Sequence, residues 1–549
     1  MRQFVSRGSR WVVLALLLGL VALPARGIEQ PARASSQPTR LSQGVLLHRW
    51  LTQPSEAPEQ LQARFQAAHD QVAAAGKTRA AGSATASPLA GARFNHDVVG
   101  LPQNEESIGV CRSNRDVVLG GTNDYRGLLD PQGTFTGWHF SNDGGASLTN
   151  EGLLPPVTVA GTQLASQGDP VDVAGLGCRL YAADLNFNAF STTAGESAIG
   201  AYRTTPARLT SCPGGADPSC WPTRRAVAVN EAGHFLDKPW MDVGVSGSAG
   251  EVVWVTYTDF NCPNPDCSPP FTNQIKAVRC NAALTNCTEP ILLSGTQNSL
   301  QFSDVTIGPD GRVYVTWEED NDLANNFEPP ERMRFWLRVA EPGSTTFGPL
   351  RRVADEPLNL GIADLHANDF RVATYPKNTV AMVEGRPRVF VVWDGCRART
   401  LGDTVCEEPA IKLRYSDDAG VSWSRTQVLS AGGDNYFPTI DADRGSGRVA
   451  VAWYTSRFDP VFHNRQDVEL VSLNRASAKV VQRQRVTRIS NEPEADPLLG
   501  GAFIGDYFEV AAEHGTGYVH FNANYVSIRL LGEGVPIPQQ DNFLIRKPL

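Results

Sequence analysis

Short runs of β-branched and aromatic residues follow one another along the chain after residue 94, and each run is bounded by Gly, Asp, Asn or Pro. Within the runs, apolar and polar positions alternate with a period of two, which indicates β-strands rather than helices. One strand pattern recurs, in which an apolar run ends in an aromatic or small residue and is followed by an acid or an amide. Its seven copies begin at Val117, Leu180, Val253, Val313, Val389, Val449 and Gly517.

Most copies belong to a unit of four short strands. One strand precedes the recurring strand, as at 240–243, and two more follow it, as at 411–416 and 425–430. Four strands per repeat are typical of a β-propeller blade. The alternative is a string of small β-sandwich domains, but one such unit has too little core to stand alone, whereas propeller blades bury their faces on each other.

We therefore predict an all-β fold in which residues 94–549 form a β-propeller of six or seven four-stranded blades, with seven favoured by the repeat count. The last unit is short of strands, so the segment 94–100 or the extreme C-terminus should complete its blade and close the ring.

The N-terminal region has a different composition. Residues 1–27 carry arginines ahead of an apolar run that is too short to span a bilayer and is followed by small residues, which is typical of a cleaved signal peptide. Residues 28–93 form a leader of low order with one short helix at about 55–75. No later segment is long and apolar enough for a membrane-spanning helix, so we expect a secreted or periplasmic protein that acts as a monomer.

Composition and charge narrow the possible functions. The 50 Gly and 37 Pro, with 19% charged and 41% hydrophobic residues, argue against a mostly helical or disordered chain. The formal charge is −9, and removal of the signal peptide takes away four arginines and no acid, which makes it −13. Nucleic acid is therefore not an expected partner, because phosphate binding needs a basic surface.

The ten cysteines all follow the signal peptide, and eight of them form close pairs. Local disulfides in an oxidising compartment are the favoured interpretation, and the remaining two cysteines would pair by elimination. A zinc site is the alternative, but the spacings are not C-x2-C and no histidines cluster nearby. The expected pairs are Cys111 with Cys178, Cys212 with Cys220, Cys262 with Cys267, Cys280 with Cys287, and Cys396 with Cys406.

Two segments, 141–148 and 416–423, fit the pattern S-x-D-x-G-x-S followed by an apolar residue or Trp, and 191–197 is a degenerate third copy. These are Asp boxes, in which the carboxylate accepts turn N–H groups, glycine takes a positive φ and the aromatic packs beneath the turn. We expect them to join the third and fourth strands of a blade. The structural residues are Asp143, Gly145, Asp418, Gly420 and Trp423.

With these boxes, the chain over roughly 95–530 resembles the Asp-box (BNR repeat) proteins of the sialidase superfamily. The segments 237–242 and 503–509 are similar to those of secreted bacterial sialidase-like propellers. The resemblance implies six blades in true sialidases, and a site with three arginines, a tyrosine nucleophile supported by a glutamate, and an aspartate acid/base. The F/Y-R-I-P motif of the first arginine is absent, since the corresponding region 110–116 has another sequence, so this catalytic set cannot be carried over.

Loops at one end of a propeller channel form the default ligand site, which makes residues just after the recurring strands candidates. At each position the alternative is that the side chain only caps a strand or a turn. Asp124 belongs to this group. The catalytic candidates are Tyr507, Asp259, Glu318 and Asp394, and the ligand-binding candidates are Arg126, Asp184, Arg397 and Arg457.

Four aspartates, Asp242, Asp304, Asp441 and Asp506, recur at what the spacing indicates are equivalent repeat positions, and we expect them to tie neighbouring inner strands together. The acidic run 317–322 offers oxygen ligands that calcium accepts, but it lacks the central Gly of an EF-hand, so a solvated acidic loop is favoured. No metal or cofactor is predicted.

Three functions remain open. The first is a propeller that binds a carbohydrate or another extracellular ligand at the channel mouth. The second is an exo-glycosidase, sialidase-like, which uses a tyrosine and carboxylates from several blades. The third is a surface protein whose ring serves as a platform for protein interactions.

Overall fold

The computed structural model describes residues 92–264, 267, 271–296, 300–320, 332–357, 360, 364–397, 406, 408–499, 501–532 and 534–549, together with 55, 62, 66, 85 and 86. The predicted signal peptide and nearly all of the predicted leader with its helix lie outside the described residues. The described residues all belong to one compact unit, 40–549.

Seven antiparallel sheets, each with four consecutive strands or their equivalent, make up the ring, so the prediction of a seven-bladed propeller is confirmed. Blade 1 is β3 (Gln103–Val110), β4 (Val118–Asp124), β5 (Thr136–Ser141) and β6 (Asn150–Leu153); blade 2 is β9 (Val171–Ala174), β10 (Leu180–Phe187), β11 (Ser197–Thr204) and β12 (Thr223–Val229); blade 3 is β13 (His234–Val245), β14 (Glu251–Asn261), β15 (Thr272–Asn281) and β16 (Ile291–Leu292).

The ring continues in the same manner to the C-terminus. Blade 4 is β17 (Leu300–Ile307), β18 (Val313–Asp320), β19 (Met333–Ala340) and β20 (Arg351–Glu356); blade 5 is β21 (Lys377–Val383), β22 (Arg386–Cys396), β23 (Pro409–Ser416) and β24 (Gln427–Val428); blade 6 is β25 (Asn435–Ala442), β26 (Arg448–Thr455), β27 (Asp467–Asn474) and β28 (Val480–Arg485); blade 7 is β29 (Glu509–Glu513), β30 (Thr516–Arg529), β31 (Pro536–Pro548) and β2 (Ala92–Arg93).

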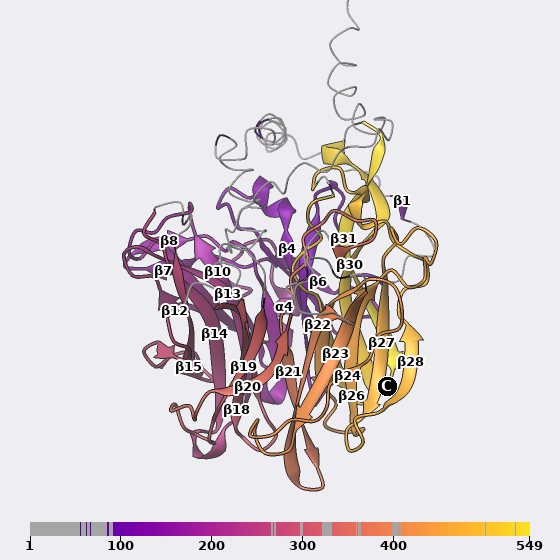
Figure 1. Ribbon diagram of the computed structural model, residues 1–549. Helices are drawn as coiled ribbons and strands as arrows, with labels where there is room; N and C mark the ends of the chain where they lie inside the picture. The colour runs from indigo at the N-terminus through magenta and orange to yellow at the C-terminus, as the bar shows by residue number, and fades with distance from the viewer. Residues whose placement is uncertain are drawn as a thin grey trace, which may run out of the picture. The chain divides into compact units, whose positions relative to one another are not determined.

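Both ends of the propeller sequence build blade 7, as the shortage of strands after the last repeat predicts. β2 pairs with β31 as the outermost strand, just before the predicted segment 94–100. β3 of blade 1 packs against β30 and β31, so the indigo and yellow ends of the ring meet in Figure 1. Closure of the ring therefore joins the first and last described strands of the propeller.

A few short elements decorate the blades. β1 (Thr85–Ala86) pairs with β30, and β7 (Val157–Val159) and β8 (Thr162–Leu164) form a separate hairpin. The helical turns are η2 (Tyr125–Leu129), η3 (Leu176–Cys178), α4 (Pro206–Ser211), η4 (Gly247–Ala249), η6 (Pro493–Ala495) and η7 (Leu530–Gly532). None of the helices within the described ranges is long and apolar enough to cross a membrane.

The recurring strand is the second strand of each blade, and its aromatic residue lies in the core. Trp254, Trp317, Trp393 and Trp453 are almost fully buried in β14, β18, β22 and β26. A tryptophan buries a large apolar surface, so these four rings give blades 3 to 6 a core against their neighbours. The repeat read from the sequence is thus a packing repeat.

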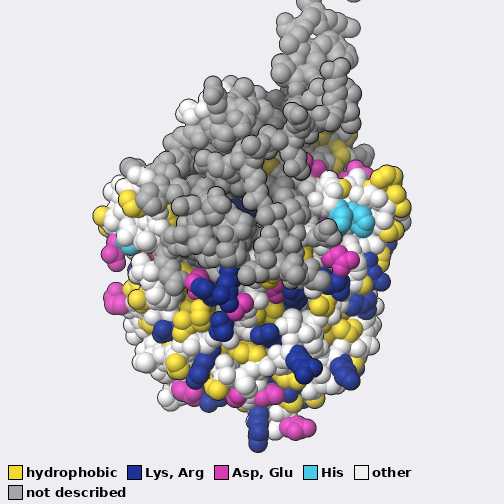
Figure 2. Space-filling view, in the orientation of Figure 1, with side chains coloured by type: hydrophobic (Ala, Val, Ile, Leu, Met, Phe, Trp, Pro, Cys, Tyr) yellow, Lys and Arg dark blue, Asp and Glu magenta, His cyan; other side chains and the backbone are white. Residues whose placement is uncertain are grey.

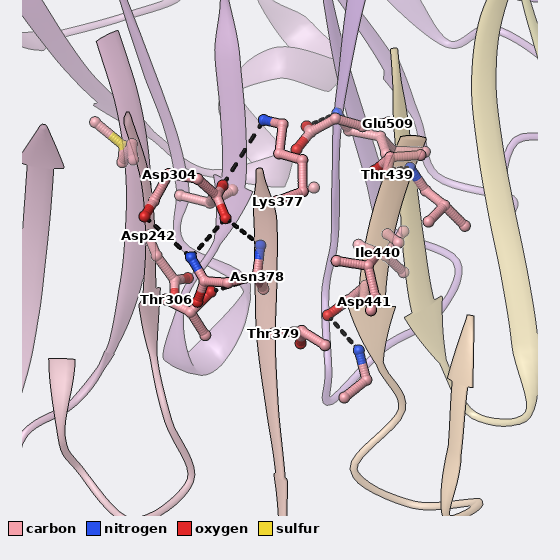
Figure 3. A pocket seen from close by; sticks show the side chains of 18 of the residues that line it. Asp242, Asp304, Thr306, Lys377, Asn378, Thr379, Thr439, Ile440, Asp441 and Glu509 are labelled. Carbon is pink, nitrogen blue, oxygen red and sulfur yellow. Dashed lines mark hydrogen bonds and ion pairs between the residues drawn. The ribbon is translucent and has the colours of Figure 1, made fainter. Parts of the chain in front are cut away.

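Carboxylates that line the channel tie one inner strand to the next (Figure 3). Asp242 accepts a hydrogen bond from Ile307 N at 2.6 Å, and Asp441 accepts one from Ala512 N at 2.7 Å. Asp304 accepts from Asn378 N at 2.6 Å. Glu509 accepts from Ile108 N at 3.0 Å, which links blade 7 to blade 1, and Asp172 accepts from Ser107 Oγ at 2.6 Å.

The predicted equivalence of the four aspartates is wrong for two of them. Asp242 and Asp441 lie opposite Trp254 and Ala450 in matching register. Asp304 lies two residues earlier, opposite Thr316, and Asp506 precedes β29 altogether. The β-bulges of β13, β17 and β25 lie at matching positions, so Asp304 corresponds to Trp240 and Thr439 rather than to Asp242 and Asp441.

The two predicted Asp-box segments have the same turn geometry at the outer end of blades 1 and 5. Asp143 accepts from Ser147 N at 2.9 Å, and Asp418 accepts from Ser422 N at 2.8 Å. Gly420 has a φ of 87°, and a Cβ there would lie 2.6 Å from Leu337 Cδ2. Trp423 packs on the apolar core of blades 4 and 5. Each turn joins the third and fourth strands of its blade.

All five predicted disulfides are present. The bonds join Cys111 to Cys178, Cys212 to Cys220, Cys262 to Cys267, Cys280 to Cys287 and Cys396 to Cys406. Five disulfides fit an oxidising compartment outside the cytosol. In the view of Figure 2, basic side chains on the described surface lie among acidic and apolar ones.

The channel carboxyl groups make the stability of the ring depend on pH. Burial raises the pKa of Asp172 to about 7 and that of Glu509 to about 8. Both groups bind their protons more tightly in the folded ring than in the unfolded chain, so the stability is present at low pH and is lost as pH rises through these values. Burial lowers the pKa of His520 to about 3, so this residue makes the stability of the ring rise with pH, but only below about pH 6.5.

We expect the free energy of unfolding to fall between pH 6.5 and pH 8, with about 1 kcal/mol from Asp172 alone. The Asp172→Asn variant should show a smaller fall, because an amide does not titrate. Urea unfolding at the two pH values tests this. Equal stability of the wild-type protein at both values, or an unchanged fall in the variant, would contradict it.

Candidate active or binding site at the channel mouth

The inner strands bend sharply where they enter the channel. Glu105, Lys238, Phe302 and Phe437 lie in β-bulges of β3, β13, β17 and β25, and each has a positive φ between 49° and 61°. Asp169 before β9 and Gly505 before β29 also have positive φ. Such backbone costs free energy for residues other than glycine and concentrates at functional sites. The repeated bend therefore marks this end of the channel.

The bent residues meet around the axis, and we call them, with Tyr375 and Asp506, the mouth ring. Its charged half comes from blades 7, 1, 2 and 3. Lys238 Nζ lies 2.6 Å from Asp506 Oδ2 and 3.5 Å from carboxylate oxygens of both Glu105 and Asp169. All four side chains are almost fully buried, so the ammonium group and the carboxylates depend on each other for their charge balance.

Asp506 is the centre of a second set of contacts. Arg371 pairs with its carboxylate, and Tyr375 donates to its backbone carbonyl at 2.7 Å. The two segments that carry the family resemblance, 237–242 and 503–509, thus meet through Lys238 and Asp506.

The other half of the mouth ring is aromatic and comes from blades 4, 5 and 6. Phe302 stacks on Tyr375 with 4.7 Å between ring centroids, and Tyr375 stacks on Phe437 at 6.2 Å. Lys238 Nζ lies 5.5 Å from the Phe302 ring, where the two halves join. Aromatic ring faces attract both cations and the apolar faces of sugars.

One step deeper, Lys377 faces the channel next to the Trp240 and Tyr507 rings (Figure 3 shows Lys377 with Asp304 and Glu509). Asp304 Oδ1 lies 3.7 Å from Lys377 Nζ, beyond hydrogen-bond distance. Burial lowers the pKa of Lys377 to about 8, against the attraction of Asp304. An anion bound beside this amine would raise the pKa of Lys377 and favour its protonated form.

Three basic groups meet at the mouth and just below it. Lys238 and Arg371 pair with Asp506, and Lys377 lies 3.7 Å from Asp304. Burial raises the pKa of Glu105 well above its usual value, against the pull of Lys238.

Two cavities adjoin the mouth ring. The channel below it encloses about 130 Å³ and is lined by all seven inner strands. A pocket of about 10 Å³, room for one water molecule, lies among Lys238, Trp240, Phe302, Tyr375, Lys377 and Tyr507. Solvent reaches Arg371, whose side chain is 22% exposed, and half-buried Phe302.

Most of the residues predicted from the sequence lie one strand away from the axis, each with its own local partner. Asp124 binds Arg126, which also pairs with Glu151 at 3.0 Å. Asp184 accepts from Thr136 Oγ1 at 2.9 Å in the buried contact between blades 1 and 2. These side chains hold loops and blades in place, and no contact joins them to Lys238 or Lys377 in the described structure.

The other candidates are equally dispersed. Asp259 pairs with His234 at 2.7 Å, and Asp394 accepts from Phe437 N at 3.3 Å. Arg397 pairs with Glu408, and Arg457 pairs with Glu469 at 2.7 Å. Glu318 is buried at the end of β18. The expected solvated loop is therefore wrong for 317–320, which belong to this strand; 321 and 322 lie outside the described residues.

Asp394 reaches the mouth ring only through the Phe437 N–H, and Tyr507 is the one predicted candidate that lines the pocket at the mouth. Its hydroxyl donates to Pro170 O at 2.9 Å, and burial raises its pKa. Within the described ranges no tyrosine hydroxyl hydrogen-bonds to a glutamate. Sequence reasoning missed Glu105, Asp169, Arg371 and Lys377 as site residues; Lys238 lay inside a segment that it singled out. Across the described residues, no group of three His, Cys, Asp or Glu side chains is arranged to hold a metal ion.

Comparisons with known proteins show the fold alone. No protein-family model matches the chain, and no curated protein is similar to it in sequence. The solved structures that resemble it include the polysaccharide lyase Uly1, at 11% identity and a TM-score of 0.42 over 83% of this chain and 92% of the lyase.

Two further neighbours are a GH93 α-L-arabinofuranosidase of Fusarium graminearum in complex with arabinobiose and the sialidase of Trypanosoma rangeli. The first has 10% identity and a TM-score of 0.37 over 66% of this chain and 92% of that chain. The second has 11% identity and a TM-score of 0.34 over 85% of this chain and 60% of that chain. At these values the likeness carries no argument about activity.

The Tyr375 hydroxyl should contribute measurably to stability. The Tyr375→Phe variant leaves the buried Asp506 carbonyl without this donor, which should lower the free energy of unfolding by about 1–3 kcal/mol. Tyr415→Phe is the matched control, since its hydroxyl makes no hydrogen bond in the described structure. Urea unfolding compares the two variants, and an equal effect would refute the role given to Tyr375.

Proposed function

We propose that this protein is an exported propeller that binds an acidic carbohydrate at its channel mouth. The observation that carries the proposal is the composition of the mouth, with stacked aromatic rings on one side and the basic groups of Lys238, Arg371 and Lys377 beside them. A sugar offers an apolar face to aromatic rings, and a sugar carboxylate is attracted to ammonium and guanidinium groups.

Arg371 and Lys377 are the groups that would meet the acidic substituent. The Arg371 side chain is partly exposed to solvent, and the ion pair of Lys377 with Asp304, at 3.7 Å, is longer than a hydrogen bond. Lys238 is held by Asp506 and is better suited to fixing the mouth than to binding a ligand. Phe302 would present its ring at the solvent-accessible edge.

Binding is favoured over hydrolysis by a tyrosine nucleophile. The Tyr507 hydroxyl donates a hydrogen bond to a backbone carbonyl and burial raises its pKa, so formation of the phenolate is disfavoured. Binding of an acidic sugar at the mouth does not require a tyrosine phenolate. The five disulfides support an extracellular or periplasmic setting in which polysaccharides are available ligands.

The test is calorimetric titration with oligosaccharides that carry hexuronic or sialic acid, beside neutral oligosaccharides of the same length. We expect acidic ligands to bind at least tenfold more tightly. At pH 8 binding should take up protons, because an anion raises the pKa of Lys377, so the measured enthalpy should vary with the ionisation enthalpy of the buffer.

Arg371→Ala should weaken binding of the acidic ligand at least tenfold. Arg397→Ala is the matched control, since Arg397 pairs with Glu408 away from the mouth, and it should bind as the wild type does. Equal affinity for neutral and acidic ligands, or equal effects of the two variants, would overturn the proposal.

A further inference from the structure

Two histidines from neighbouring blades stack at the protein surface. His366 lies in the segment before β21 of blade 5, and His463 lies between β26 and β27 of blade 6. Their ring centroids are 4.8 Å apart with an interplanar angle of 30°. The His366 side chain is 41% exposed, and His463 is half-buried. Both rings are therefore within reach of a small solute.

One buried scaffold fixes both rings. His366 Nδ1 bonds to Asp434 Oδ1 at 2.5 Å, and the backbone N–H of His366 donates to Asp434 Oδ2 at 3.0 Å. His463 Nδ1 lies 3.3 Å from Ser456 Oγ. The same Ser456 hydroxyl accepts from Asp434 N at 2.8 Å. The two imidazoles are thus oriented through a single Asp434–Ser456 unit, which is itself buried.

This arrangement leaves Nε2 as the remaining nitrogen of each ring. Neither Nε2 has a hydrogen-bond partner within the described residues. A histidine whose Nδ1–H is donated to a carboxylate presents Nε2 as a lone-pair donor, which is the common arrangement behind a metal-bound imidazole. Asp434 stands in this relation to His366.

The backbone also holds the pair together. His463 has a φ of 55°, an unfavourable conformation that brings its ring to this place. Its carbonyl accepts from Asn368 Nδ2 at 3.4 Å, which ties the two segments. Two neutral imidazoles can stack at this distance, whereas two protonated rings would repel each other.

We propose that His366 and His463 bind one divalent transition-metal ion through their Nε2 atoms, with Asp434 as a positioning residue behind His366. Imidazole nitrogen suits Zn²⁺, Ni²⁺ and Cu²⁺, whereas Ca²⁺ and Mg²⁺ prefer oxygen ligands. The described residues supply no third His, Cys, Asp or Glu side chain to this pair. Water completes the coordination, so the site is open to a further ligand.

Calorimetric titration of untagged protein with ZnCl₂, NiCl₂ and CuCl₂, each alone, tests the site. We expect one ion per chain for each metal and no binding of CaCl₂. The electron paramagnetic resonance spectrum of the Cu²⁺ complex should show coupling to two imidazole nitrogens. His366→Ala and His463→Ala should each weaken binding at least tenfold, and Asp434→Asn should weaken it about 10–100-fold.

His514→Ala is the matched control, because His514 is an exposed single histidine on blade 7 that bonds to Arg112 O. It should bind metal as the wild type does. Since Asp434 is buried, its variant is compared only if its circular dichroism matches that of the wild type, and the two surface histidine variants decide the question. Absence of binding to the wild type, or binding unchanged in both histidine variants, would overturn the proposal.

Discussion

The rest of the structure depends on the ion cluster around Lys238. Seven inner strands converge on one axis, and their first residues come so close that polar groups there are shielded from water. One ammonium group lies between the carboxylates of Asp506, Glu105 and Asp169, which come from three other blades. Each of these charges would be costly if it were buried alone. The ring can therefore close only where the charges from different blades balance.

The same convergence gives the mouth its two chemical halves. Bulged backbone brings Glu105, Lys238, Phe302 and Phe437 to the axis at equivalent positions, so the identity of one residue per blade decides what the mouth offers. Charged residues occupy one arc and aromatic residues the other. Deeper in the channel, carboxylates bind backbone N–H groups of the next strand and serve the scaffold. Residues of the mouth ring thus differ in role from residues two positions further along the same strand. Phe302 lines the mouth, for example, whereas Asp304 binds the backbone of the next inner strand.

Sequence reasoning predicted the parts of the fold that depend on local pattern. The seven recurring strands, the paired cysteines and the glycine-containing turns at 141–148 and 416–423 all follow from alternation, spacing and turn chemistry, and the ring closure follows from the missing strand. It could not predict the bulges, because a bulge leaves the alternation of residues on either side intact.

The site was harder to predict because its members are far apart in the chain and chemically ordinary. Asp259, Asp394 and Arg457 end strands in the expected place, but the second strand of a blade lies away from the axis. Lys238 follows a bulge on an inner strand, and only the folded ring brings it to Asp506, 268 residues later. Tyr507 also belongs to a segment, 503–509, that resembles those of other propellers, which is a signal of a different kind from local pattern.

The coupling energy between Lys238 and Asp506 tests the account most directly. A double-mutant cycle with Lys238→Met, Asp506→Asn and the combined variant, followed by urea unfolding, isolates the pairwise contribution. The account predicts a coupling of about 1.5–3 kcal/mol, with each single variant strongly destabilised and the double variant less stable than the wild type by much less than the sum. A coupling near zero would contradict the central place given to this ion cluster.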